Sequence, residues 1–295
     1  MDIDFGEIYD FGDVSVCENP FLIAEIGINH NGNLNLTKKL ISSAKEAGFN
    51  AVKFQKREIN IVYSKDYLDS PRESPWGNTQ RDQKLGLEFT LDDYHIIDDF
   101  CREKNIEWFV SCWDKKSQSD MRVFNTKYNK VASAMATNLE FLDEVAKEKK
   151  ETFLSTGMMN LEQIDQATNI FNKHDCPFIL MHTVSTYPAY PEELNLRCIN
   201  TLKERYKCKV GYSGHESNVS PSFIAFLMGA VAIERHITLD RTMYGSDQSA
   251  SLEFRGMVEL VNRIRNTKAV LGDGKKLIAD RENAVAKKLR YWEES

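Results

Sequence analysis

Short apolar runs alternate with helix-type segments along the chain. Most of the runs are almost continuously apolar, which is typical of parallel strands covered on both faces. Strands that alternate with helices indicate βαβ units and a parallel sheet. The eight predicted strands are Phe21–Gly27, Ala51–Gln55, Ile106–Cys112, Lys130–Ala134, Thr152–Thr156, Phe178–Thr183, Lys209–Ser213 and Val231–Leu239.

The segments between these runs carry apolar residues at helical spacing and signals for helix starts. Capping motifs at Thr90–Asp93 and Asn160–Gln163 each open a predicted helix. Ser220 and Pro221 are read as a cap and a first-turn proline. The predicted helices are Leu36–Ala47, Tyr94–Lys104, Leu161–Asn172, Phe223–Gly229 and Glu253–Leu271.

Strands and helices that alternate in this way over 295 residues predict an α/β fold, the single-domain (β/α)8 TIM barrel. An open doubly wound sheet is the alternative, but it usually has fewer strands, and its dinucleotide form carries a glycine fingerprint that Gly27–Gly32 does not match. We expect residues 1–20 to form an N-terminal extension, 21–274 the catalytic barrel and 275–295 a C-terminal arm with a short helix.

One connection is much longer than the others. The segment Arg57–Phe89 is rich in Pro, Ser, Asn and charged residues and contains Tyr67 and Trp76. Structureless loops of this length are uncommon and often act as lids over a site. Two interpretations stay open, a functional lid and a plain surface excursion.

Composition narrows the classes of partner. With 42% hydrophobic and 28% charged residues the chain is typical of a soluble globular protein, and its net charge of −6 favours neither nucleic acid nor an anionic membrane as a partner.

The 6 cysteines form no C-x-x-C pair, which predicts reduced thiols. The N-terminus lacks a signal-peptide pattern, and no apolar run approaches the roughly 20 residues of a membrane span. We therefore expect a cytoplasmic protein.

Polar side chains occur at the predicted strand ends, where barrel enzymes place functional groups. Lys53 and Glu25 stand inside apolar strands, where a charge is costly unless it is paired or used. They indicate one of two things. One is a site that binds a phosphate or carboxylate ligand, and the other is a buried Lys–Glu ion pair that only stabilises the barrel. His215 and His236 end adjacent strands. They either share a divalent ion or are two histidines with their hydrogen bonds satisfied inside the fold. His30 is a weaker candidate for a metal ligand.

A series of short motifs follows the predicted strands from about Phe21 to Arg290. They are Ala24-Glu-Ile-Gly-Ile-Asn-His-Asn-Gly32, Ala51-Val-Lys-Phe-Gln55, Ser155-Thr-Gly157, Tyr187-Pro188, Gly211-Tyr-Ser-Gly-His215, Glu234-Arg-His236 and Leu271-Gly-Asp-Gly-Lys275. Taken together and in this order, they resemble the sialic acid synthase family, which includes N-acetylneuraminate, legionaminate and pseudaminate synthases.

The resemblance implies a transferase that condenses phosphoenolpyruvate with an open-chain N-acetylated amino sugar, giving a nonulosonic acid and phosphate by C–O cleavage. It also implies a divalent metal, Mn²⁺ or Mg²⁺, between His215 and His236, and a homodimer. Glu25 is implied as an acid or base, so the catalytic set is Glu25, His215 and His236. The residues implied to bind phosphoenolpyruvate are Lys53, Lys130, Ser133, Ser155 and Ser213, and those implied to face the sugar are Gln55, Asn78, Tyr187 and Asp247.

The chain departs from the family pattern at several points. Cys112 replaces a hydroxyl after the third strand, and Ser185 stands where asparagine is common. The sequence stops at Ser295, where typical members continue into a small antifreeze-like domain that reaches across a dimer, so we expect a short form without that domain.

Two other functions stay open. One is condensation of phosphoenolpyruvate with another aldose or an aldose phosphate, of the 3-deoxy-octulosonate type. That reaction needs an additional arginine cluster, for which Arg81, Arg241 and Arg255 are the candidates. The other is a non-catalytic barrel that serves as a binding partner, against which the presence of Glu25 and Lys53 argues.

Overall fold

The eight predicted strands close into a parallel barrel. The computed structural model describes residues 3–10 and 15–293. Each barrel strand hydrogen-bonds to a neighbour on both sides, so the sheet has no free edge and the open-sheet alternative is excluded. In barrel order the strands are β3 (Phe21–Gly27), β4 (Ala51–Lys56), β7 (Glu107–Cys112), β8 (Tyr128–Val131), β9 (Glu151–Ser155), β10 (Phe178–Thr183), β11 (Val210–Gly214) and β12 (Ala232–His236).

Six of the predicted strands match to within one residue at each end, and the predicted bounds of the other two are wrong by more. The fourth was expected over Lys130–Ala134, but β8 begins at Tyr128, and Ser133 already belongs to a 3-10 turn, η2 (Ser133–Met135). The polar Asn129 is tolerated in this buried strand because its side chain donates to Glu148 Oε2 at 3.0 Å. The eighth strand ends at His236, earlier than the predicted Leu239.

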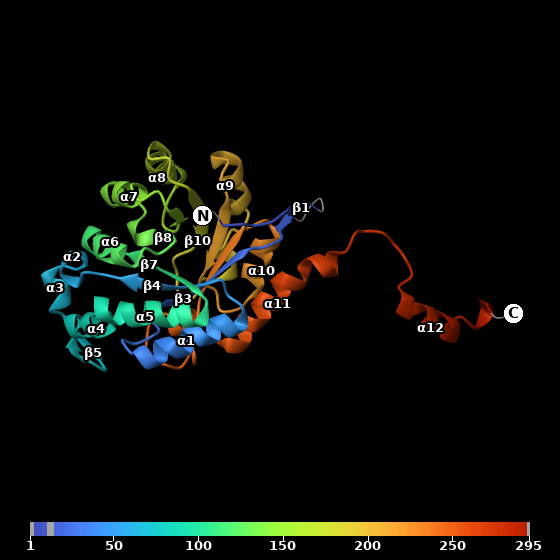
Figure 1. The fold of residues 1–295 in the computed structure, drawn as a ribbon, viewed down its shortest axis with the longest axis horizontal. Coiled ribbons are helices and arrows are strands. Elements are labelled where there is room, and N and C mark those ends of the chain that lie inside the picture. The colour runs from blue at the N-terminus through green and yellow to red at the C-terminus, as the bar shows by residue number, and fades with distance from the viewer. Residues whose placement is uncertain (1–2, 11–14, 294–295) are drawn as a thin grey trace. The chain divides into compact units, whose positions relative to one another are not determined.

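Helices surround the strands (Figure 1). The capping boxes at Thr90–Asp93 and Asn160–Gln163 are both formed, as predicted. Ser220 is not a cap, because it is the first residue of its helix and Val219 holds the cap position without a side-chain bond. The helices are α1 (Leu34–Ala47), α5 (Leu91–Lys104), α6 (Lys115–Met121), α7 (Leu139–Ala146), α8 (Leu161–Lys173), α9 (Cys198–Tyr206), α10 (Ser220–Leu227) and α11 (Phe254–Leu271).

The inside of the barrel is layered. The ring of Phe153 stacks on Phe21 and Phe109, with centroids 5.6 and 5.5 Å away, and Tyr128 lies edge-on to Phe21 at 5.1 Å. Alternate residues of a strand face the same side, so the residues two positions further along also point inward. On β7, β8 and β9 these residues are polar, namely Ser111, Lys130 and Ser155, whereas β3 has Ile23 at this step and its inward polar residue, Glu25, one step later. An aromatic floor therefore lies beneath a polar layer at the carboxyl ends of the strands.

The segment Arg57–Phe89, called the lid below, is folded rather than structureless. It contains α2 (Ile59–Val62), α3 (Lys65–Leu68), β5 (Pro71–Ser74), β6 (Gly77–Thr79) and α4 (Gln80–Leu87). Trp76 of the lid packs edge-on against Tyr244, in the loop after β12, with ring centroids 5.7 Å apart. A Cβ on Gly86 would lie 2.1 Å from the Trp76 ring, and one on Gly32 would lie 2.0 Å from the Gly86 carbonyl oxygen. The two glycines therefore let the lid rest closely on the loops at the barrel mouth.

The chain divides into two compact units, Met1–Ile264 and Arg265–Ser295. The first includes an antiparallel hairpin of β1 (Ile8–Asp10) and β2 (Ser15–Cys17) before the barrel. The second contains the helix α12 (Asp280–Leu289), within the predicted arm. The expected barrel bounds, residues 21–274, stay a prediction. Within the described ranges, no helix is long and apolar enough to span a membrane.

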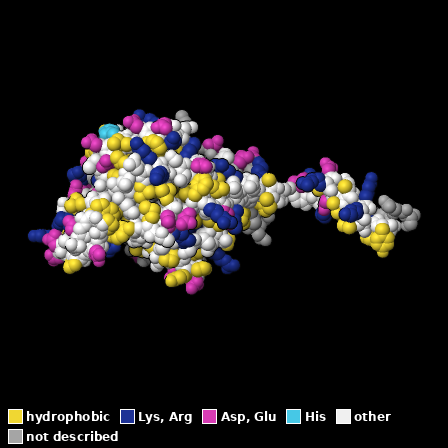
Figure 2. Space-filling model, turned by 90° about the horizontal axis from the view of Figure 1, so that it is seen from below, with side chains coloured by type: hydrophobic (Ala, Val, Ile, Leu, Met, Phe, Trp, Pro, Cys, Tyr) yellow, Lys and Arg dark blue, Asp and Glu magenta, His cyan; other side chains and the backbone are white. Residues whose placement is uncertain are grey.

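Charges of both signs are interspersed on the face shown in Figure 2. Because the formal net charge is −6, an anionic substrate depends on cations that are concentrated locally. The 6 cysteines are all unpaired, and Cys101, Cys112 and Cys176 are among the buried ones. This agrees with the predicted reduced thiols.

Candidate active site

A cavity opens at the carboxyl ends of the barrel strands. Its volume is about 640 Å³ with the open mouth included, and it lies where barrel enzymes bind their substrates. The predicted site residues that line it are Glu25, Lys53, Gln55, Lys130, Ser133, Ser155, Tyr187, Ser213, His215 and His236. The barrel thus gathers into one place side chains that lie far apart in the sequence.

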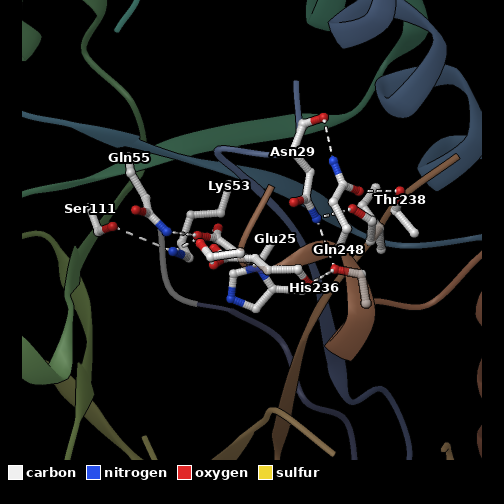
Figure 3. Close-up of polar contacts among 12 residues, drawn as sticks. Glu25, Asn29, Lys53, Gln55, Ser111, His236, Thr238 and Gln248 are labelled. Atoms are coloured by element: carbon white, nitrogen blue, oxygen red, sulfur yellow. Dashed lines mark hydrogen bonds and ion pairs between the residues drawn. The ribbon is translucent and has the colours of Figure 1, made fainter. Parts of the chain in front are cut away.

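Lys53 is at the centre of a charge network in this cavity (Figure 3). Its Nζ lies 2.7 Å from Glu25 Oε2 and donates to Ser111 Oγ at 3.4 Å. Gln55 Nε2 donates to the other Glu25 oxygen at 2.8 Å. Lys53 is 2% and Glu25 1% exposed, so their charges interact with little screening by water. Glu25 is therefore fixed on both oxygens, with its carboxyl group at the cavity wall.

Lys130 and Lys53 share a second carboxylate, Glu234. Glu234 Oε2 lies 3.1 Å from Lys130 Nζ, and Oε1 lies 3.7 Å from Lys53 Nζ. Lys130 also donates to Ser155 Oγ at 2.7 Å, and Ser213 Oγ donates to Glu234 at 3.2 Å. Burial lowers the pKa of Lys130. Burial alone would raise the pKa of Glu234, but the two lysines outweigh it and hold that pKa well below the usual carboxyl value. Two ammonium groups and two hydroxyls thus form one compact surface that can bind an anion.

Ser133 reaches the cavity from a turn and not from a strand. Lys130 and Ser133 are three positions apart, so on a regular strand they would face opposite sides. The η2 turn returns Ser133 to the cavity, where its Oγ accepts a hydrogen bond from the Gly157 backbone N–H at 3.1 Å. The residue stays in the candidate site, although the element that carries it differs from the prediction.

His215 and His236 lie together at the cavity wall, with ring centroids 5.5 Å apart. His215 Nδ1 donates to the Val184 carbonyl at 2.6 Å, which leaves Nε2 free of a proton when the ring is neutral. Burial, reinforced by the neighbouring His236, lowers the pKa of His215 to about 3, so the ring is neutral near pH 7. A neutral imidazole is the form that binds a metal ion.

The residues present fit a divalent ion held by two imidazoles. His236 Nδ1 is buried and has no hydrogen-bond partner among the described residues. A Cβ on Gly27 would lie 3.3 Å from His236 Cε1, and the backbone φ of Gly27 is +56°, so a glycine keeps this side of the ring clear. No cluster of three or more His, Cys, Asp or Glu side chains suited to a metal occurs in residues 3–10 and 15–293. Water and substrate oxygens would therefore complete the coordination.

Tyr187 and Asp247, two of the residues predicted to face the sugar, flank the histidines. The Tyr187 ring lies 4.0 Å from that of His215 and is 46% exposed, and burial raises the pKa of its phenol. Asp247 Oδ2 lies 3.8 Å from His236 Nδ1, although Asp247 does not line the cavity itself. Both residues therefore lie beside the pair of imidazoles, and Tyr187 also lines the cavity.

Asn78 and His30 lie elsewhere. Asn78 is an exposed residue of β6 on the lid and does not line the cavity. His30 is buried against Phe89, with ring centroids 4.2 Å apart, and its Nδ1 accepts from the Gly32 N–H. His30 is thus a packing residue in this structure, in keeping with its weaker candidacy.

Asn29 connects the loop after β3 to the loop after β12 (Figure 3). Its Nδ2 donates to the Ile237 carbonyl at 2.9 Å and to Ser251 Oγ at 2.8 Å, and the backbone carbonyl of Asn29 accepts from Gln248 Nε2 at 3.4 Å. These bonds hold the backbone immediately beyond His236. They limit how far that ring can shift.

A buried ion pair lies behind the two histidines. Glu216 and Arg235 are the sequence neighbours of His215 and His236, and unlike the histidines they do not line the cavity. Arg235 Nη1 lies 2.9 Å from Glu216 Oε1, and the side chains are 0% and 2% exposed. Tyr212 Oη donates to the other Glu216 oxygen at 2.8 Å. The pair therefore ties the ends of β11 and β12 together at the level of the histidines.

Arg235→Met is expected to lower the free energy of unfolding by about 3–5 kcal/mol, because it leaves the Glu216 carboxylate buried without its cation. Urea denaturation followed by circular dichroism measures the change. The control is Arg205→Met, which breaks the exposed pair with Asp165 and should cost less than about 1 kcal/mol. Equal losses in the two variants would contradict a special role for the buried pair.

Glu234 is the main site residue for which no role was predicted. It bridges both lysines, and it stands two positions before His236 on the same strand, so alternation along the strand turns both side chains to the same face. Other lining residues without a predicted role are Ser111, Trp113, Met158, Thr183 and Ser185. Met158 is 67% exposed and has a positive φ of 61°, at the rim of the cavity.

Comparisons with known proteins show the family of this chain. The NeuB family profile matches residues 40–276. The chain is 36% identical over 272 residues to N-acetylneuraminate-9-phosphate synthase of Homo sapiens, covering 91% of this chain and 76% of that protein. It is 33% identical over 270 residues to N,N'-diacetyllegionaminic acid synthase of Legionella pneumophila, covering 89% and 76%. The crystal structure of N-acetylneuraminic acid synthetase from Leptospira borgpetersenii, in complex with citrate, has a TM-score of 0.79 and 28% identity over 98% of both chains.

Proposed function

The chain belongs to the NeuB family of synthases, and we propose that it condenses phosphoenolpyruvate with the open-chain form of an N-acetylated amino sugar to give a nonulosonic acid and phosphate. The chain is thus an enzyme of the transferase type. One observation carries the proposal: two buried lysines and two facing histidines share a single cavity at the barrel mouth.

Phosphoenolpyruvate is proposed to bind on the lysine side. It carries a phosphate and a carboxylate, and both need cations and hydrogen-bond donors in a site with little water. Lys53 and Lys130 supply the charge, with their ammonium groups linked through Glu234. The hydroxyls of Ser133 and Ser155 are the additional donors, and Ser213 is proposed to line the same surface while its hydroxyl donates to Glu234. Because the lysines are already paired with carboxylates, they stay fixed before the substrate arrives.

The amino sugar is proposed to bind on the histidine side, with Gln55, Tyr187 and Asp247 facing it. Asn78 of the lid does not line this cavity, and its contact with the sugar stays a prediction. A divalent ion, manganese or magnesium, held by His215 and His236 would supply Lewis-acid activation of the sugar's carbonyl group. The neutral ring of His215 and the unpaired Nδ1 of His236 support these two residues as ligands.

The bond changes of the proposed reaction are these. C3 of phosphoenolpyruvate forms a bond to the aldehyde carbon, and the aldehyde oxygen gains a proton. Water adds to C2, and the bond between C2 and its bridging oxygen breaks, so phosphate leaves with that oxygen. Glu25 is proposed to take the proton from the water that adds at C2, because Lys53 and Gln55 hold its carboxylate 2.7 and 2.8 Å away.

Phosphate release tests this function. The protein is incubated with Mn²⁺ or Mg²⁺, a panel of N-acetylated hexosamines, and phosphoenolpyruvate labelled with ¹⁸O at the bridging oxygen. We expect release that depends on the sugar, with the label in the phosphate. Label kept in the sugar acid would contradict C–O cleavage, and no release with any aldose would favour a non-catalytic barrel.

The family resemblance is also the basis for proposing a homodimer. Light scattering coupled to size-exclusion chromatography measures the mass directly, against 33.9 kDa for one chain.

A further inference from the structure

The side-chain amide of Gln55 is held at both of its polar atoms. Its Nε2 donates to Glu25 Oε1 at 2.8 Å (Figure 3), and its Oε1 accepts from Arg57 Nη2. Gln55 is partly exposed at the cavity wall, and a glutamine side chain has several rotatable bonds whose freedom must be lost before it holds one position. The two hydrogen bonds together therefore fix where the amide meets Glu25.

The groups around this amide favour one orientation of it. The guanidinium of Arg57 has N–H donors and no acceptor, whereas an ionised carboxylate such as that of Glu25 has acceptors only. If the amide were turned over, its NH2 group would face the donors of Arg57 and its oxygen would face the carboxylate. Arg57 thus keeps an N–H of Gln55 directed at the group that is proposed to take the proton from water.

Arg57 is itself fixed where the two ends of the lid meet. Its backbone N–H donates to Glu88 Oε2 at 3.0 Å, and its Nη1 lies 3.4 Å from Glu88 Oε1. The guanidinium carbon lies over the Trp113 ring, 4.1 Å from the ring centroid. Because Arg57 is only 9% exposed, water screens these interactions little. A single arginine therefore connects the base of the lid with Gln55 in the cavity.

We propose that Arg57 is a positioning residue for Glu25. It holds the amide of Gln55, and through that amide the carboxylate, in the geometry that proton transfer from water needs. This inference rests on the proposed function, which makes Glu25 the base. Arg57 follows the motif that ends at Gln55, no role was predicted for it, and it does not line the cavity. It therefore acts through Gln55 and not by contact with a substrate.

Steady-state rates of matched variants test this role. We expect Arg57→Met to lower kcat about tenfold by weakening a charge-assisted hydrogen bond, and to change the KM for phosphoenolpyruvate by less than about twofold. Arg57→Lys keeps a cationic donor and should recover part of the loss. The control is Lys56→Met, because Lys56 lies 3.6 Å from the same Glu88 and donates to the Phe89 carbonyl at 3.0 Å. It leaves the amide of Gln55 in place, so kcat should stay within about twofold of wild type.

A double-mutant cycle separates positioning through Gln55 from any other role of Arg57. Gln55→Ala removes the amide, so adding Arg57→Met to this variant should lower kcat further by less than about twofold. Four results would each overturn the positioning role. They are no loss of kcat in Arg57→Met, an undiminished loss in the Gln55→Ala background, an equal loss in Lys56→Met, and a defect confined to the KM of the acceptor.

The amide can also be observed without turnover. The ¹⁵N–¹H signals of the Gln55 side chain are identified by their absence in Gln55→Ala. We expect ¹⁵N relaxation to show a rigid amide in wild type and in Lys56→Met, and a mobile amide in Arg57→Met. An equally rigid amide in Arg57→Met would overturn the inference. Absence of turnover with every acceptor would overturn the proposed function instead, and the amide signals would still decide whether Arg57 holds Gln55.

Discussion

His236→Ala is expected to remove metal-dependent turnover while the barrel stays folded. The two imidazoles are the proposed protein ligands, with ring centroids 5.5 Å apart, so the variant keeps only His215. Loss of Lewis-acid stabilisation worth several kcal/mol should lower kcat/KM by roughly 10³-fold. Steady-state rates across a Mn²⁺ titration of chelator-treated protein measure this loss. The Kd for Mn²⁺, from the electron paramagnetic resonance signal of the free ion, reports binding independently of activity.

The matched control is His95→Ala. His95 is an exposed residue of α5 whose ring lies 4.7 Å from that of Phe124, and it does not line the cavity. Its removal should leave the Mn²⁺ affinity at the wild-type value. If His236→Ala, stripped of metal and then resupplied, turned over at the wild-type rate, the ligand role would be wrong.

Lys53→Met is expected to raise the KM for phosphoenolpyruvate by roughly 10- to 100-fold, because the loss of one charge-assisted hydrogen bond weakens binding by about this factor. Methionine keeps the apolar stem of the side chain but removes the ammonium group that lies 2.7 Å from Glu25. Initial rates with each substrate varied in turn distinguish the two KM values, and the acceptor KM should change much less.

Lys45→Met provides the comparison, because Lys45 is outside the cavity and its Nζ donates to the Asn105 carbonyl at 2.6 Å. It should leave both KM values unaltered. A defect of Lys53→Met confined to the acceptor would assign Lys53 to the sugar and refute its proposed place beside phosphoenolpyruvate.

The sequence was sufficient to predict the barrel because its strands are buried on both faces and therefore stand out as apolar runs. The run at β8 was misplaced because Asn129 interrupts it, and only the bond to Glu148, a residue beyond that strand, makes this polar side chain acceptable in a buried strand. The element that carries Ser133 was not predictable for a similar reason. A strand and a 3-10 turn would direct its side chain differently, and the local sequence pattern does not distinguish these two conformations.

Site residues that end a strand were predictable, whereas contacts across the lid were not. Period-2 alternation gives the direction of Lys53 and of His236 from their own strands. The packing of Trp76 on Tyr244 joins parts of the chain that no local pattern relates.

The close stacking of Gly32, Gly86 and Trp76 matters for anyone who wishes to redesign this enzyme for bulkier acceptors. That side of the entrance has no room even for a methyl group, since an added carbon at Gly86 would come within 2.1 Å of the indole. Met158 offers the adaptable side, because its side chain is 67% exposed. Its φ of 61° restricts a redesign library there to residues that tolerate left-handed backbone, with glycine and asparagine first and β-branched residues last.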